Sequence, residues 1–201
     1  MFVYAANKVN EQDANRSLAK RKKTFTEEEW EEQLSQIKRK QLVFDDSTKF
    51  YLVPFGAHKE AKVEELKSAL GPNTAVIDLN ELIKQQMDSP ESTYGALLGK
   101  TLDGFDTNKS ACFYTFTYRL APGLFTKLVK TTSQKLKAQN PELTNFVLLN
   151  YPNTIPEAIK FEQDVAVAQK LVLLDNQETD SNIVDYFRTV NKVADLDQLK
   201  K

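Results

Sequence analysis

The segment of residues 50–66 constrains the fold of this chain more than any other. It begins with the apolar run 50–53, which is typical of a short buried strand. A Pro-Phe-Gly turn at 54–56 follows, and residues 61–69 then place apolar side chains at helical spacing. Phosphate-binding loops occur in such a strand–turn–helix unit, because the helix N-terminus presents unpaired N–H groups. Most of the glycines of such a loop are absent here, so we expect the structural unit without its ligand site.

The alternation of short apolar strands and helices continues through the rest of the chain. Apolar runs without period-two alternation are typical of parallel strands that are buried on both faces. We expect four further strands at 74–78, 146–149, 171–175 and 192–197. Helices are expected at 80–87, 94–102, 122–139, 155–161 and 183–190. The pattern predicts the α/β class: a three-layer α/β/α domain with a five-stranded parallel sheet.

Residues 1–45 are expected to form a separate arm and helix, and residues 46–201 the α/β domain. Thr26 and the glutamate three residues later have the spacing of a capping box, which predicts a helix start. Trp30, Leu34 and Ile37 then fall on one stripe of that helix. Two interpretations remain open: the helix docks on its own domain, or the stripe binds a partner protein.

A second candidate for partner contacts lies within residues 103–118. A polar turn is followed there by an aromatic run that includes Phe113, Tyr114 and Phe116. The run is either a strand or an extended segment packed over the surface. Aromatic side chains can also stack on nucleic-acid bases, but few basic residues are interleaved with these. Packing in the core or at a protein interface is therefore the favoured interpretation.

The composition excludes several classes of function. The net charge of −1 gives no global basic field that would recruit nucleic acid. The single cysteine, Cys112, and the single histidine, His58, leave no cysteine- or histidine-rich metal site. The apolar runs are too short to span a bilayer, and no secretory signal is visible at the N-terminus. We expect a soluble intracellular protein without a metal or cofactor.

Several segments resemble, in chain order, the adenylate kinase family of nucleoside monophosphate kinases. Residues 148–158, LLNYPNTIPEA, resemble that family's LDGFPRTxxQA segment. Residues 52–66 align without a gap to its phosphate loop LGGPGSGKGTQxxxL, with Gly56 and Lys59 in place. Residues 80–84, NELIK, resemble its GDLLR segment. The resemblance covers about residues 48–198 and implies a P-loop kinase type of fold.

The departures from the family pattern imply that catalysis has been lost. Pro54 and Glu60 replace glycines of the phosphate loop, which removes an N–H group and places a carboxylate where a phosphate would lie. Leu149 replaces an aspartate that helps to organise magnesium, and Asn153 replaces an arginine that clamps phosphate. Only residues 176–182 stand where the family has its arginine-rich lid. No catalytic residue is expected.

The resemblance thus implies a non-catalytic structural or interaction subunit on an adenylate kinase-like scaffold. Gly56, Lys59 and Lys84 are vestigial positions of the nucleotide site, and nucleotide binding is not expected. The expected partners are other proteins of a larger assembly, with a ciliary axonemal complex as the first location and a mitochondrial complex as the second. Two alternatives remain: an inactive nucleotide sensor that uses Lys59 and Lys84, and an active small nucleotide kinase.

Overall fold

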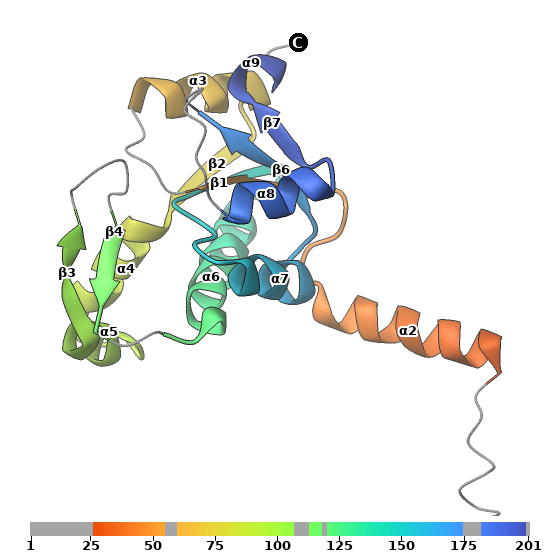
Figure 1. Ribbon diagram of the computed structural model, residues 1–201, viewed down its shortest axis with the longest axis horizontal. Helices are drawn as coiled ribbons and strands as arrows, with labels where there is room; N and C mark the ends of the chain where they lie inside the picture. The colour runs from red at the N-terminus through yellow and green to blue at the C-terminus, as the bar shows by residue number, and fades with distance from the viewer. Residues whose placement is uncertain (1–25, 55–59, 107–112, 118–119, 175–181, 200–201) are drawn as a thin grey trace, which may run out of the picture. The chain divides into compact units, whose positions relative to one another are not determined.

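A computed structural model describes residues 26–54, 60–106, 113–117, 120–174 and 182–199 of the chain (Figure 1). The chain divides into two units, Met1–Lys40 and Gln41–Lys201. The second unit contains all the strands of the described residues. Among the described residues, none of the helices combines the length and the apolar character needed to cross a bilayer.

The second unit is built on a five-stranded parallel sheet in the order β2-β5-β1-β6-β7. The strands are β1 Lys49–Val53, β2 Thr74–Asp78, β5 Asn145–Leu149, β6 Ala168–Leu173 and β7 Val193–Asp195. β1 lies at the centre, where Phe50 pairs with Phe146 on one side and with Ala168 on the other. The α/β class and the five-stranded parallel sheet predicted from the apolar runs are confirmed.

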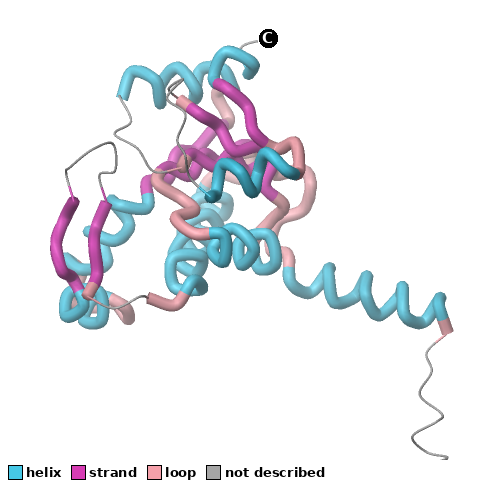
Figure 2. The backbone as a smooth tube through the Cα atoms, in the orientation of Figure 1, coloured by secondary structure: helices cyan, strands magenta, loops and turns pink. Residues whose placement is uncertain are grey.

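Helices cover both faces of the sheet, as Figure 2 shows. One face packs against α3 Glu60–Leu70 and α9 Leu196–Leu199, and the other against α4 Leu79–Asp88, α6 Pro122–Gln139, α7 Ile155–Asp164 and α8 Asn182–Thr189. Successive side chains of a strand point to opposite faces. Phe50 and Leu52 therefore enter the core under α4, α6, α7 and α8, whereas Tyr51 and Val53 enter the core under α3 and α9.

A cluster of aromatic rings fills the larger of these two cores. The rings of Phe50 and Phe146 are stacked, with their centroids 5.1 Å apart. Phe44 and Phe161 meet the Phe50 ring edge-on at 5.2 Å and 5.4 Å. Offset-stacked and edge-on rings add to the burial of apolar area. The cluster joins the central strands to α7 and to the segment that precedes β1.

A small antiparallel sheet stands apart from the main one and follows α5, Gly95–Thr101. It pairs β3, Leu102–Asp106, with β4, Phe113–Phe116. The aromatic run therefore forms a strand over 113–116, which settles the alternative left open by its sequence. Its partner β3 was not expected, because the sequence LDGFD has two aspartates and a glycine, all residues depleted in strands.

Candidate functional site

The helix α2, Glu27–Gln41, is the first candidate surface, and its start is defined by a capping box. The Thr26 hydroxyl accepts a hydrogen bond from the Glu29 amide at 3.3 Å, and the Thr26 amide donates to the Glu29 carboxylate at 3.0 Å. These reciprocal bonds satisfy two amides that a helix start otherwise leaves without acceptors. The spacing recognised in the sequence thus has the expected structural effect.

Two large apolar side chains of α2 are exposed to solvent. Trp30 is 55% exposed and Leu34 is 38% exposed. They lie four residues apart, so they share one face of the helix. Ile37, the third predicted contact residue, follows three residues after Leu34 in α2, and its side chain lies outside the described residues. An exposed tryptophan beside an exposed leucine is the kind of surface that anchors a protein partner.

The aromatic candidates of β4 are placed differently. Tyr114 and Phe116 are half-buried and pack against the core of the second unit. The ring of Phe116 lies 6.0 Å from the ring of Phe125 on α6. The side chain of Phe113 lies outside the described residues. The two rings that are described therefore have a packing role, and their part in partner contacts stays a prediction.

The carboxyl edge of the main sheet is where an α/β fold of this type would hold a ligand. The strand β1 is followed by α3 on one face, whereas its neighbours β5 and β6 are followed by α7 and α8 on the other face. This is a topological switch point, the usual position of ligand crevices in open α/β sheets. Of the vestigial positions, Gly56 and Lys59 lie outside the described residues, and Lys84 is exposed on α4.

At this edge, polar side chains bond to one another across the ends of β2 and β5. Asn150, which follows β5 in the left-handed backbone region with φ 58°, donates through its amide nitrogen to Asp78 at 2.8 Å. The same carboxylate oxygen of Asp78 accepts a hydrogen bond from the backbone N–H of Asn80 at 2.9 Å and so caps α4. Asp78 therefore serves a structural role in joining the two strand ends. The other amide atom of Asn150, Oδ1, is buried without a hydrogen-bond partner among the described residues.

Tyr151 ties the same loop to two helices. Its hydroxyl donates to the Glu157 carbonyl at 3.2 Å and lies 2.8 Å from the Thr126 hydroxyl. The tyrosine has a single hydroxyl hydrogen, so Thr126 donates in the second bond. Burial is the main cause of the strongly raised pKa of Tyr151. The phenol therefore keeps its proton at neutral pH and is a fixed hydrogen-bonding group.

Glu157 completes this buried group of residues. Only 5% of the residue is exposed, and its carboxylate accepts a hydrogen bond from the backbone N–H of Asn153 at 2.8 Å. The Thr154 hydroxyl in turn accepts from the Glu157 amide at 3.4 Å and caps α7. The carboxylate thus fixes the loop that leads from β5 into α7. The bond between Thr126 and Tyr151 was missed from the sequence because the two residues are 25 positions apart in the chain.

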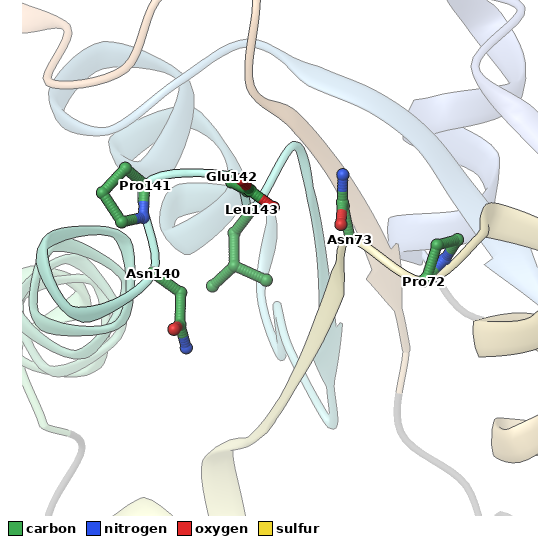
Figure 3. Close-up of a pocket in the computed structure, with 6 residues that line it drawn as sticks. All are labelled: Pro72, Asn73, Asn140, Pro141, Glu142 and Leu143. Atoms are coloured by element: carbon green, nitrogen blue, oxygen red, sulfur yellow. The ribbon is translucent and has the colours of Figure 1, made fainter.

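A shallow pocket of about 410 Å³ lies at the opposite edge of the sheet, where β2 and β5 begin (Figure 3). It is lined by Pro72, Asn73, Asn140, Pro141, Glu142 and Leu143. The Asn73 carbonyl accepts hydrogen bonds from the amides of Thr144 and Asn145, each at 3.1 Å, which holds the two strand starts together. The lining residues include one carboxylate and no nucleophile. Nothing in this arrangement points to a reaction.

Comparison with known proteins decides the family. A family model described as the AIM36 C-terminal domain matches residues 50–196 of this chain. The chain belongs to the AIM36 family. The family match includes residues of all five strands of the sheet, from Phe50 in β1 to the start of α9, so the AIM36 C-terminal domain corresponds to the α/β domain described above.

Curated relatives of the AIM36 family cover most of this chain. The protein named "Altered inheritance of mitochondria protein 36, mitochondrial" of Zygosaccharomyces rouxii is 30% identical over 187 residues, which are 93% of this chain and 72% of that protein. The protein of the same name from Candida tropicalis is 29% identical over 222 residues, 97% of this chain and 70% of that protein. Both names place the relatives in mitochondria.

These findings correct the family assignment made from sequence motifs. The resemblance to adenylate kinases is wrong, since the matched family is AIM36. The scaffold function inferred from it, its nucleotide-sensor and kinase alternatives, and the ciliary axonemal location are withdrawn with it. The short motifs that produced the resemblance are features of a parallel α/β sheet, such as the strand β1 with the helix α3 that comes next and the proline-containing loop after β5.

Proposed function

We propose that this AIM36 protein binds another protein in mitochondria without catalysing a reaction, and that α2 is its contact surface. The observation that supports the proposal most is the exposure of Trp30 and Leu34 on one face of a capped helix. Tryptophan is enriched among the residues that dominate binding energy at protein interfaces. The mitochondrial names of the relatives support the location.

The non-catalytic part of the proposal is supported by the bonding at the carboxyl edge of the sheet. Within the part of the chain that the structure describes, Asp78, Tyr151 and Glu157 are groups at this edge that could transfer a proton. Asp78 caps a helix and holds Asn150, the Tyr151 phenol is buried with a raised pKa, and Glu157 holds the Asn153 amide. Each of these groups therefore maintains the fold at a position where an enzyme would place its chemistry.

Site-specific photo-crosslinking tests the proposal. A photoreactive aromatic residue placed at position 30 in yeast mitochondria is expected to form a discrete adduct with a protein. The same residue at exposed Lys67 on α3 serves as the control and is expected to form none. Leu34→Ala should reduce the adduct at position 30, whereas Leu97→Ala, which truncates a leucine that is 46% exposed on α5, should not.

The outcomes separate the parts of the proposal. A protein that does not fractionate with mitochondria contradicts the location. A position-30 variant that forms no adduct with any protein contradicts the binding function. Glu157→Gln is expected to lower thermal stability and to leave the adduct unchanged, because its role is to hold the loop after β5. An adduct lost in a folded Glu157→Gln protein would show that the buried group takes part in function.

A further inference from the structure

The charges of α2 are segregated along its length. Before its middle residue, Leu34, the helix contains five glutamates and no basic residue: Glu27, Glu28, Glu29, Glu31 and Glu32. After Leu34 it contains three basic residues and no acidic one, at positions 38–40. Acidic residues at the N-terminus and basic residues at the C-terminus suit the helix dipole. Because of this distribution, the N-terminal half of α2 is complementary in charge to its C-terminal half.

The apolar residues of α2 follow the spacing of a helix-pairing seam. Trp30, Leu34 and Ile37 are separated by four and then three residues. This is the alternation of a and d positions in a heptad, which places the residues along one line facing a second helix. Trp30 and Leu34, whose side chains are described, are exposed on that line. The 15 residues of α2 extend about 22 Å, or roughly two heptads.

We propose that α2 pairs with α2 of a second copy of this chain, in the antiparallel direction. A two-fold axis near the middle of α2 places the acidic half of each helix beside the basic half of the other. A parallel arrangement would place the five glutamates of one helix beside those of the other, which is repulsive. The charge pattern therefore selects the second copy, antiparallel, as the occupant of the exposed seam. This inference rests on the proposed function and names the partner.

The register of the pair follows from the seam. In an antiparallel pair an a position faces a d position, so Leu34 of one helix lies opposite position 37 of the other, and the two-fold axis passes between positions 35 and 36. Glu31 and Lys38 directly follow the seam positions 30 and 37, so they occupy equivalent flanking positions. In an antiparallel pair, equivalent flanking positions of the two helices face each other. Glu31 of each copy is thus placed beside position 38 of the other, twice by symmetry.

Charge exchange at these two positions tests the inference in the whole chain. Sedimentation equilibrium from micromolar to millimolar concentration is expected to show a reversible dimer. Glu31→Lys and Lys38→Glu should each weaken dimerisation on the order of five-fold, since two attractive pairs become repulsive. The double variant Glu31→Lys/Lys38→Glu should recover the affinity, and an equimolar mixture of the two single variants should form a heterodimer.

Glu28→Lys is the matched control, because it makes the same charge change in the same helix away from the seam. It should leave the dimer affinity within two-fold of the original. A chain that stays monomeric at millimolar concentration overturns the inference, and so does a double variant that fails to recover. A Glu28→Lys dimer as weak as the Glu31→Lys dimer also overturns it.

The failure of this inference can be distinguished from the failure of the proposed function. An adduct between position 30 and a different protein, together with a monomeric purified chain, overturns the pairing of two copies and supports the binding function. An adduct between two copies of the chain supports both. The absence of any adduct at position 30 removes the binding function and the pairing with it.

Discussion

At the scale of single residues, the hydroxyl of Tyr151 is expected to stabilise the fold. It is fully buried and bonded to Glu157 and Thr126. Tyr151→Phe removes both bonds and should lower the free energy of unfolding by about 1–2 kcal/mol. Tyr51→Phe is the control, because Tyr51 is 8% exposed and no hydrogen bond of its hydroxyl is described. Urea denaturation followed by circular dichroism measures both, and equal losses would contradict the assigned role of the bonds.

The raised pKa of Tyr151 also leads us to expect that the stability of the fold falls at alkaline pH. The pKa of Tyr151 lies above its ordinary value of 10.0, chiefly through burial and also through the nearby carboxylates of Glu157 and Asp164. In the unfolded chain the phenol loses its proton near pH 10, while the folded chain retains it. The stabilisation is therefore complete below that pH and is lost as the pH rises above it.

Tyr151→Phe should remove part of this alkaline loss. Urea denaturation from about pH 8 to about pH 11 is expected to show a shallower decline in the variant than in the original chain. Tyr51, whose pKa is also raised by burial, accounts for part of the remaining slope. Identical slopes in the two proteins would show that Tyr151 ionises in the folded state as easily as in the unfolded state.

Local sequence patterns predicted those residues of the candidate site that interact within a few positions of chain, and missed those that interact across the sheet. Thr26 and Glu29 were recognised because a capping box is defined within three residues of chain. The bond between Asn150 and Asp78 joins residues 72 positions apart and depends on the adjacent ends of β5 and β2. No local pattern specifies such a pair. The exposure of Leu97 was missed for a related reason, since a leucine on a surface has the same sequence signal as a buried one.

At the scale of helices, two glycines of α5 are expected to respond oppositely to substitution. A Cβ at Gly95 would overlap the carbonyl oxygen of Gln86 in α4, whereas a Cβ at Gly99 meets no described atom within 4 Å. Gly95→Ala should therefore cost about 1–3 kcal/mol of stability through overpacking. Gly99→Ala should add about 0.5–1 kcal/mol through helix propensity. Thermal denaturation measures both, and a neutral Gly95→Ala would show that α4 and α5 separate easily.

Removal of the cap of α2 is expected to destabilise that helix alone, whereas removal of the cap of α7 is expected to destabilise the whole second unit. Thr26→Ala removes the acceptor of the Glu29 amide and should weaken α2 by about 1 kcal/mol. Amides of α2 should then exchange with solvent about five-fold faster, with no change in the unfolding of the second unit. Thr154→Ala removes the cap of α7, which is packed in the core, and should lower the stability of that whole unit by a similar amount. Hydrogen exchange resolves the two cases, and slowed α2 amides in Thr26→Ala would contradict the assignment.

The elements of the main sheet were predictable, and those of the small sheet were not. Parallel strands that are buried on both faces appear in the sequence as short apolar runs, as in residues 146–149. β3 has no such run, and its strand conformation comes from pairing with β4. The helix expected at 94–102 is α5, Gly95–Thr101, and Leu102 belongs to the strand β3 that follows it directly.

At the scale of the whole molecule, the family assignment shows why fold and function separate. The succession of β1 and α3 and the loop at residues 150–154 arise from the geometry of a parallel sheet, and unrelated families share them. They therefore supported the correct class of fold together with an incorrect family. The residues that distinguish the chain, such as Trp30 and the bonded pair Asp78–Asn150, lie outside those motifs or depend on contacts across the sheet.

Because one sheet carries a core on each of its faces, we expect the two cores to unfold together. Leu52 of β1 is buried under α4, α6, α7 and α8, and Leu66 of α3 is buried on the opposite face. Leu52→Ala and Leu66→Ala should each cost about 2–5 kcal/mol. Because both cores are built on the same five strands, far-ultraviolet and near-ultraviolet circular dichroism should give coincident urea transitions in each variant.

The single tryptophan provides an internal comparison for this experiment. Trp30 is already 55% exposed in the folded chain, so its emission should change little through the urea transition of the sheet. Val167→Ala, which truncates a side chain that is 50% exposed, should leave that transition unshifted. Separate transitions in Leu66→Ala would show that the face under α3 and α9 opens before the other. Such a result would contradict a single cooperative domain and place the weakest part of the fold beside α3.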